Sequence, residues 1–267
     1  MLFTLMLRAC VRCSAPIASR GSSRRTMATA QRVVAQVDGS PVLIYNLARY
    51  YYDAKPFDSV GTRDGGNGDL TGFRLWEAAP HLIGYLDRHR SVVQGRTVLD
   101  LGAGTGAVGL AAAALGASRT VLSDADSTVT VASSNGWEER GRLATLADNV
   151  TLNGRDDVMS VEALRWGDDA HLSSLSARWP NGFETIVASD VLYSPRMYDG
   201  LETTIRTLAA ADAVVVLSYP VRHGDEHTFM ERLRPEFECS SREPTSEDEP
   251  SATESALRVV ELRRVAG

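Results

Sequence analysis

The stretch TVLDLGAGTGAVGLAAAALGA, residues 97–117, decides the fold of this chain. Its first five residues, TVLDL, predict a short buried strand, and its alanine-rich second half predicts a helix. Between them stand three glycines at alternate positions, Gly102, Gly104 and Gly106. Glycine lets the backbone turn sharply and approach a ligand closely, while the N–H groups that open the helix attract negative or polar groups. The order of strand, glycine loop and helix therefore predicts a ligand-binding loop.

Outward from this stretch, strand and helix patterns alternate. We expect further strands at 119–124, 158–164, 184–190 and 213–219, with helices at 107–117, 137–153 and 197–211. The strands are continuous apolar runs, which is typical of a parallel sheet covered by helices on both faces. Residues 226–238 predict a helix that leads into a short strand, and the alternating run 256–264 predicts a last strand. The predicted fold is therefore a doubly wound α/β domain, with a mostly parallel, seven-stranded, Rossmann-like sheet and an antiparallel C-terminal edge strand.

Two segments predict loops. Residues 125–136 read as an extra surface loop before the long helix, and residues 240–255, which are polar and acidic, predict a mobile loop.

The composition fits one acidic domain. The 267 residues are 43% hydrophobic and 23% charged, which is enough for one sizeable core. Six arginines and no acid occur before Asp38, so the rest of the chain holds 22 basic and 34 acidic residues. A body with this acidic excess argues against a broad phosphate-binding surface and is compatible with a basic protein partner.

Residues 1–31 differ from the rest because they are rich in Arg and Ser and lack acids, which is typical of an organelle transit peptide. A disordered leader, or sequence upstream of a true start at Met27, are the alternatives. We expect this leader to be followed by a single domain, 32–267, with an N-terminal cover segment, 32–95, and a core, 96–267. The predicted location is the cytoplasm, or the mitochondrion if the leader is a transit peptide. No apolar run approaches the ~18 residues of a membrane span.

The three cysteines, Cys10, Cys13 and Cys239, provide neither a disulfide framework nor a second cysteine pair for zinc. We therefore expect no metal site.

An acid ends the second strand of the core, about twenty residues after the glycine loop. Asp124 at this position could accept hydrogen bonds from two ribose hydroxyls, and Asp126, past the strand end, ranks second. A plain solvated acid is the alternative. The run from Gly102 to Ala107 also fits the dinucleotide fingerprint, but a lone match of this kind leaves the ligand open.

Several motifs together carry a family resemblance. DLGAGTG, the acid in VLSDAD and the run ASDVLY resemble class I, seven-β-strand, S-adenosylmethionine-dependent methyltransferases. The chain is most similar to the protein-lysine methyltransferases of family 16, the methyltransferase-like 21 group. That group has an Asp-x-x-Tyr motif, matched by Asp190 to Tyr193, an upstream Trp segment, matched by Trp76 in 72–86, and a Leu-x-Trp-Gly segment, matched by Trp166 in 164–168. The resemblance extends from about Gly72 to Leu217.

The resemblance implies S-adenosylmethionine as cofactor and assigns it a set of residues. Those expected to hold it are Trp76, Asp100, Gly102, Ala103, Gly104, Gly106, Asp124, Trp166, Ala188 and Ser189. The glycine loop would approach the methionine end, Asp124 the ribose, and Trp166 the adenine, where a flat apolar face provides stacking contact. Trp76 would cover the cofactor, and Ala188 and Ser189 are small where it passes the strand end. Each tryptophan could instead be an ordinary core residue.

Asp190 and Tyr193 are the predicted catalytic pair. A lysine ammonium has no lone pair, and with a free pKa of about 10.4 only roughly one lysine in 2,500 is neutral at pH 7. An acid at the strand end can attract and orient the amine, and Tyr193 can line the channel with a cation–π contact or a hydrogen bond. The alternatives are a cap on a helix that starts near Pro195 for Asp190, and ordinary packing for Tyr193.

Rival functions fit less well. A short-chain nicotinamide oxidoreductase needs Tyr-x-x-x-Lys in the fold, but the only lysine, Lys55, precedes it. Nucleic-acid and glutamine methyltransferases carry Asn/Asp-Pro-Pro-Tyr after the fourth strand, whereas this chain has Ser189, Asp190, Val191 and Leu192 there. The prediction is a soluble monomer that methylates a lysine of a protein substrate and binds neither nucleic acid nor membrane. A small-molecule methyltransferase and a non-catalytic binding module of the same fold remain open.

Overall fold

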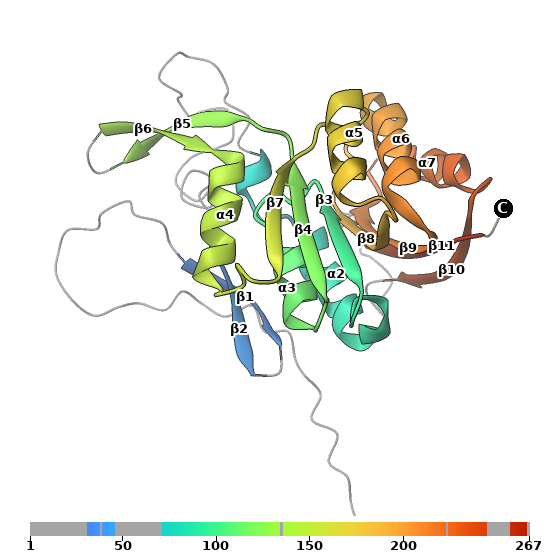
Figure 1. Cartoon of the computed structure of the whole chain (residues 1–267), viewed down its shortest axis with the longest axis horizontal. Helices are drawn as coiled ribbons and strands as arrows, with labels where there is room; N and C mark the ends of the chain where they lie inside the picture. The colour runs from blue at the N-terminus through green and yellow to red at the C-terminus, as the bar shows by residue number, and fades with distance from the viewer. Residues whose placement is uncertain are drawn as a thin grey trace, which may run out of the picture.

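A seven-stranded sheet forms the centre of the molecule, in the order β10-β11-β9-β8-β3-β4-β7 (Figure 1). The computed structural model describes residues 31–37, 39–45, 71–133, 136–222, 224–244 and 257–265. The strands of this sheet are β3 (Thr97–Leu101), β4 (Arg119–Asp124), β7 (Met159–Ala163), β8 (Phe183–Ser189), β9 (Ala209–Pro220), β10 (Phe237–Pro244) and β11 (Leu257–Arg264). The first five are parallel to one another, and β11 is antiparallel to both of its neighbours. The predicted fold class is confirmed, with one refinement: β11 lies one strand in from the edge, and β10 forms the edge itself.

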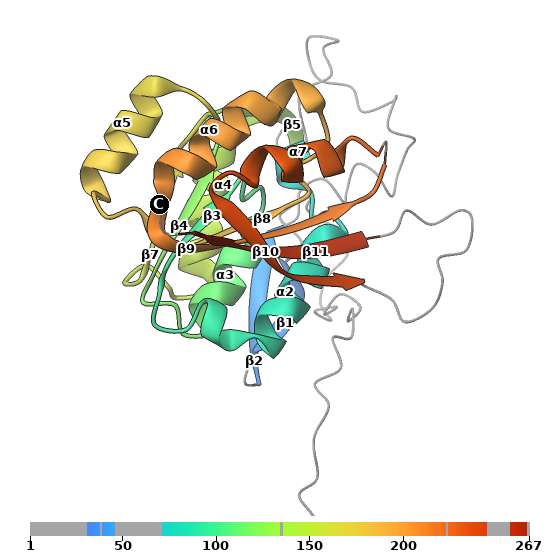
Figure 2. The same ribbon diagram turned by 90° about the vertical axis from the view of Figure 1, so that its right-hand side faces the viewer.

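Helices cover both faces of the sheet (Figure 2). They are α2 (Ala78–Arg88), α3 (Ala107–Ala114), α4 (Arg142–Leu152), α5 (Asp169–Arg178), α6 (Tyr198–Leu208) and α7 (Glu226–Leu233). One apolar cluster joins α2, α3 and α4 to the sheet, and a second joins α5, α6 and α7 to it. Within β8, Val187 belongs to the first cluster, whereas Ile186 and Ala188 belong to the second. Because alternate side chains enter two apolar layers, the central strands are apolar throughout.

The segment after β4 differs from the prediction. Residues predicted as a surface loop and as the start of a helix form a hairpin, β5 (Thr128–Ser133) and β6 (Gly136–Gly141), which extends away from the central sheet (Figure 1). The loop prediction for 125–136 is therefore wrong, and the helix predicted from 137 begins only at Arg142. The run TVTVAS is rich in β-branched residues, which favour strands, and Gly141 has an extended backbone that separates the strand from α4.

Smaller differences concern element ends. The helix predicted to 211 ends at Leu208, and Ala209 begins a longer β9. The helix predicted to 117 ends at Ala114. Helix α5 was not predicted at all. The loop prediction for 240–255 is wrong over 240–244, because these residues belong to β10, and residues 245–256 lie outside the described residues.

The N-terminal segment predicted as a cover, 32–95, contributes to the hydrophobic core. Strands β1 (Gln31–Val37) and β2 (Ser40–Tyr45) pair antiparallel, and their Val34, Val42 and Ile44 are buried in the same cluster as α2, α3 and α4. A short 3-10 helix, η2 (Thr71–Phe73), precedes α2. Residues 1–30 of the predicted leader and Lys55 lie outside the described residues. Among the helices that the structure describes, none is long and apolar enough to cross a membrane.

Candidate active site

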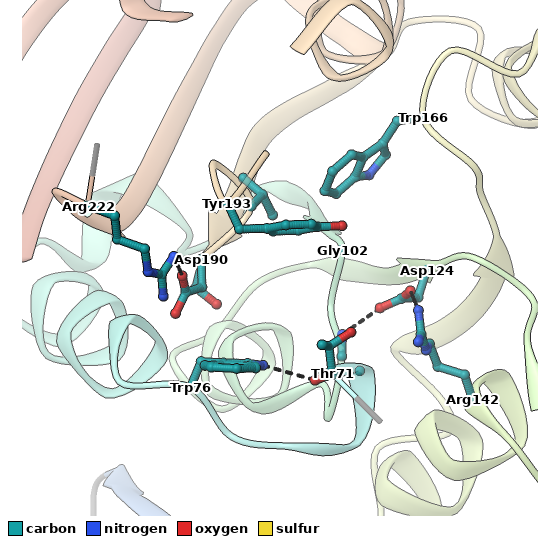
Figure 3. A pocket seen from close by; sticks show the side chains of 13 residues that line it. Thr71, Trp76, Gly102, Asp124, Arg142, Trp166, Asp190, Tyr193 and Arg222 are labelled. Carbon is teal, nitrogen blue, oxygen red and sulfur yellow. Dashed lines mark hydrogen bonds and ion pairs between the residues drawn. The ribbon is translucent and has the colours of Figure 1, made fainter. Parts of the chain in front are cut away.

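A pocket of about 380 Å³ lies at the carboxyl ends of the parallel strands (Figure 3). In open α/β sheets ligands bind at this edge, where the strand order reverses. Here β3, β4 and β7 follow one another towards one edge of the sheet, and the chain then crosses back to β8 on the other side of β3, so the reversal lies between β3 and β8. Residues that line the pocket follow β3, β4, β7, β8 and β9, and others come from η2 and the start of α4. They are Thr71, Gly72, Trp76, Gly102, Gly104, Asp124, Arg142, Trp166, Ser189, Asp190, Val191, Tyr193 and Arg222.

The glycine loop forms the floor of the pocket. Gly102, Gly104 and Gly106 all have positive φ angles, of 71°, 56° and 79°, which glycine adopts readily. A Cβ atom on Gly102 would lie 2.8 Å from the Cζ2 atom of Trp166, so only a glycine leaves room there. The fold therefore requires glycine at position 102, both for the turn of the backbone and for the space beneath the Trp166 indole.

Asp124 ends β4 at one end of the pocket. Its Oδ2 atom accepts a hydrogen bond of 2.8 Å from the Gly104 N–H, and its Oδ1 atom accepts one of 2.9 Å from Arg142 Nη1. Both side chains are about nine-tenths buried, at 10% and 8% exposure. The carboxylate is thus fixed beside the glycine loop. Asp126, the second candidate, is exposed and does not line the pocket.

Asp190 follows β8 at the other end of the pocket. It has a φ angle of 60° and is the only non-glycine residue in the left-handed region among those that the structure describes. Asp tolerates this region better than most residues. Its N–H donates to the Ser218 carbonyl at 2.8 Å, and its carboxylate accepts a 2.7 Å bond from Arg222 Nη1. Ser194, not Asp190, is the N-cap of the 3-10 helix η4 (Pro195–Met197), so the helix-cap alternative fails.

Three aromatic residues surround the space between the two acids. Trp166 and Tyr193 lie along one wall with ring centroids 6.4 Å apart, and Trp76 lies along the other wall (Figure 3). Tyr193 is 56% exposed, so ordinary core packing does not account for it. Trp76 is held in place by a 2.9 Å bond from its Nε1 atom to the Thr71 carbonyl, and the Arg74 guanidinium lies 4.5 Å from its ring centroid.

Comparison with known proteins identifies the family to which the chain belongs. A family model described as lysine methyltransferase matches residues 62–236, about two-thirds of the chain. The chain belongs to the lysine methyltransferase family. The matched range includes every residue that lines the pocket.

Individual relatives are also named as lysine methyltransferases. The protein N-lysine methyltransferase METTL21A of Danio rerio is 30% identical over 61% of this chain and 67% of its own length. The EEF1A lysine methyltransferase 3 of Mus musculus is 31% identical over 61% of this chain and 62% of its own length. Among solved structures, SMU.776, described as a methyltransferase and crystallised with SAH, superposes with a TM-score of 0.55 over 87% of this chain and 56% of its own, at 13% identity. This last likeness shows the fold alone.

The pocket fits the methyl donor of the family, S-adenosylmethionine. A volume of about 380 Å³ falls in the range of ligand sites, roughly 300–1,000 Å³. The floor is bare backbone at Gly102 and Gly104, a carboxylate stands beside it, and Trp166 presents a flat apolar face. These are the groups that an amino-acid chain, a ribose and an adenine require.

Eight of the twelve predicted site residues line the pocket, and four do not. Asp100 is 1% exposed beneath the loop and accepts a 2.8 Å bond from the Gly109 N–H, and its burial raises the pKa of this carboxyl to about 7. Ala188 is fully buried in the second apolar cluster, and Ala103 packs against the first. Gly106 is the N-cap of α3. These four residues support the glycine loop and β8 without lining the pocket.

Five residues that line the pocket were not predicted: Thr71, Gly72, Arg142, Val191 and Arg222. Gly72 lies so close to Arg142 that a Cβ atom on it would overlap the guanidinium. The signal for Arg222 was its position three residues after the predicted strand 213–219, because all parallel strands of a sheet end at the same edge. Arg142 gave no comparable signal, since it fell inside a predicted helix.

Proposed function

We propose that this chain transfers a methyl group from S-adenosylmethionine to the ε-amino group of a lysine in a protein substrate. The observation that carries the proposal is that one pocket joins the glycine loop and Asp124 to Asp190 and Tyr193. The first pair suits the cofactor and the second suits an amine acceptor. Membership of the lysine methyltransferase family supports the same reaction.

The cofactor side consists of residues that bind without reacting. Gly102 and Gly104 provide backbone against which the methionine part would lie, and Asp124 would accept hydrogen bonds from the ribose hydroxyls. Trp166 would stack on the adenine, and Trp76 would cover the pocket from the side of η2. When bound, S-adenosylmethionine supplies a methyl group activated by its sulfonium charge.

The acceptor side must bring an amine lone pair to the methyl group. In this proposal Asp190 accepts a hydrogen bond from the lysine amine and so aims it into the pocket. The exposed ring of Tyr193 lines the entrance, where it contacts the aliphatic stem of the lysine and the cation at its end. The proton of the incoming ammonium leaves to water through this entrance. Most of the rate enhancement then comes from holding the two reactants in line.

The proposal is tested with the full chain, S-adenosylmethionine labelled in its methyl group, and a cell lysate. Calorimetry first measures binding of the unlabelled cofactor, since a chain without measurable affinity would be a non-catalytic module. The labelled lysate is then divided into proteins and small metabolites. Label in proteins supports the proposal, and label confined to metabolites contradicts it. Purified elongation factor 1A is a useful first acceptor, because the name of the mouse relative refers to it.

Three further expectations belong to the same proposal. The chain acts as a monomer, does not bind nucleic acid, and works in the cytoplasm, or in mitochondria if residues 1–31 direct import. Light scattering, a nucleic-acid binding assay and localisation of a tagged full-length chain test them separately.

A further inference from the structure

The acceptor end of the pocket contains an arginine as well as the acid. Arg222 follows β9 and lines the pocket, and its Nη1 atom lies 2.7 Å from Asp190 Oδ1 (Figure 3). The Asp190 side chain is 7% exposed and that of Arg222 is 31% exposed. The guanidinium therefore reaches inward from the solvent edge to a nearly buried carboxylate.

The backbone of Arg222 is also fixed. Its N–H donates a 2.8 Å hydrogen bond to Glu226 Oε1, and Glu226 is 3% exposed in the first turn of α7. This bond holds the chain where it leaves β9, directly beside the end of β8. The position of the guanidinium thus follows from the sheet and α7 together.

Charges in the pocket are paired. Asp124 is paired with Arg142 at the cofactor end, and Asp190 with Arg222 at the acceptor end. Other charged groups of this region are Glu226, bonded to the Arg222 backbone, Asp225, which is exposed before α7, and Arg74, whose guanidinium lies 4.5 Å from the ring centroid of Trp76. The charged residues that line the pocket therefore sum to zero rather than to a negative value.

This pairing matters for a lysine acceptor. A lone carboxylate next to the amine would stabilise the ammonium form and raise the pKa of the bound lysine, which opposes reaction. A guanidinium on the same carboxylate offsets part of this effect while it leaves the second carboxylate oxygen able to accept a hydrogen bond. Asp190 can then orient the lysine amine while it stabilises the unreactive ammonium form less.

We propose that Arg222 is a positioning residue that acts through Asp190 to keep the bound acceptor lysine in its neutral, nucleophilic form. The inference rests on the proposed function. The ammonium gives one proton to water, the amine lone pair then forms the new N–C bond as the S–C bond breaks with its electron pair on sulfur, and the product is a methylated ammonium.

The size of the effect follows from Coulomb's law. At an effective dielectric of about 20, a unit charge about 6 Å from the amine changes its pKa by roughly two units, and solvent at the partly exposed guanidinium reduces this to roughly one. Removal of the charge should therefore move the acidic limb of the rate–pH profile upward by about one pH unit. At pH 7 this corresponds to a loss of roughly tenfold.

The experiment measures initial rates of methyl-lysine formation in total lysate protein from pH 6 to 10, with the full chain. Arg222→Gln keeps a hydrogen-bond donor but loses the charge, and Arg222→Lys keeps the charge. Arg234→Gln removes the same charge from an exposed surface ion pair with Glu231 and serves as the matched control. Calorimetry of S-adenosylmethionine binding and thermal unfolding show whether each variant is folded.

We expect Arg222→Gln to shift the limb upward by about one unit, to approach the wild-type rate at high pH, and to retain cofactor affinity. Arg222→Lys should keep the limb near its wild-type position, and Arg234→Gln should not move it. A rate lowered equally at every pH would show a merely structural role, and a faster Arg222→Gln would show that the arginine only plugs the site; both overturn the inference. A wild-type chain that forms no methyl-lysine contradicts the proposed function itself, whereas an active wild type with an unshifted Arg222→Gln limb contradicts this inference alone.

Discussion

Replacement of Asp190 by asparagine separates the proposed chemistry from structure. Asparagine has the same shape and also tolerates the left-handed backbone at φ 60°, but it lacks the charge. Alanine is a poorer choice, because a left-handed alanine adds a strain of roughly 1–2 kcal/mol. Asp190→Asn therefore leaves the turn intact and weakens two interactions, the one with the acceptor amine and the ion pair with Arg222.

The expected loss of rate follows from the contact removed. A hydrogen bond to a charged group contributes about 1.5–3 kcal/mol, and each 1.36 kcal/mol corresponds to tenfold in rate, so turnover should fall roughly 10- to 150-fold. The ion pair with Arg222 is partly exposed, at 31% for the arginine side chain, so its loss should cost no more than about 1 kcal/mol of unfolding free energy. For a chain of this size that is a decrease of roughly 2–4 °C in Tm.

Three measurements complete this test: initial rates with labelled cofactor and lysate protein, calorimetry of S-adenosylmethionine binding, and thermal unfolding. Cofactor affinity should remain within about threefold of wild type, because Asp124 and the glycine loop lie at the other end of the pocket. Loss of cofactor affinity together with rate, or a Tm lowered by more than about 10 °C, would show that Asp190 is structural. An unchanged rate would remove it from the mechanism.

Other residues give further predictions. Gly102→Ala should destabilise the chain by about 1 kcal/mol or more, because the φ angle of Gly102 is 71° and a Cβ atom there would lie 2.8 Å from Trp166. Calorimetry should then detect no cofactor binding, and normal binding would contradict the role given to the glycine loop. Arg142→Met should lower the unfolding free energy in denaturant by about 3–5 kcal/mol, since Asp124 loses its buried partner, and the added change Asp124→Asn should restore part of it; a fully additive pair would mean the two residues do not interact. Burial raises the pKa of Asp100 to about 7, above its ordinary value of 3.8. Its neutral form is therefore favoured in the folded state. The stability of wild type relative to Asp100→Asn should be greatest below about pH 4, fall by up to roughly 4 kcal/mol between about pH 4 and pH 7, and stay level above that; a difference that does not change with pH would show that the carboxyl is not buried in this way.

Local sequence signals were sufficient for the core of the fold. The strand, glycine loop and helix over residues 97–117 form as expected, and Asp124 and Asp190 lie at strand ends in the same pocket. These features follow from apolar runs, glycine positions and the common edge at which parallel strands end, all of which are visible in one dimension.

Features that depend on contacts between side chains distant in the sequence could not be predicted from local sequence signals. Arg142 pairs with Asp124 and Arg222 with Asp190, which lie 18 and 32 positions away in the sequence, and no periodic pattern marks such pairs. The position of Arg222 after a strand indicates its edge of the sheet but not its partner. Asp100 belongs to the same motif as the glycines, but the pleat of β3 turns its carboxyl inward to Gly109. The β5–β6 hairpin was misread because its second strand, GWEERG, continues without a break in helical spacing into α4.

Lysine methylation by this chain is tested most directly with S-adenosylmethionine that carries a deuterated methyl group and with tandem mass spectrometry of lysate proteins, with wild type and Asp190→Asn compared in parallel. We expect the heavy methyl group on lysine side chains, with the signal reduced at least tenfold in the variant. Heavy methyl groups on arginine or glutamine, or equal lysine labelling by the two proteins, would contradict it.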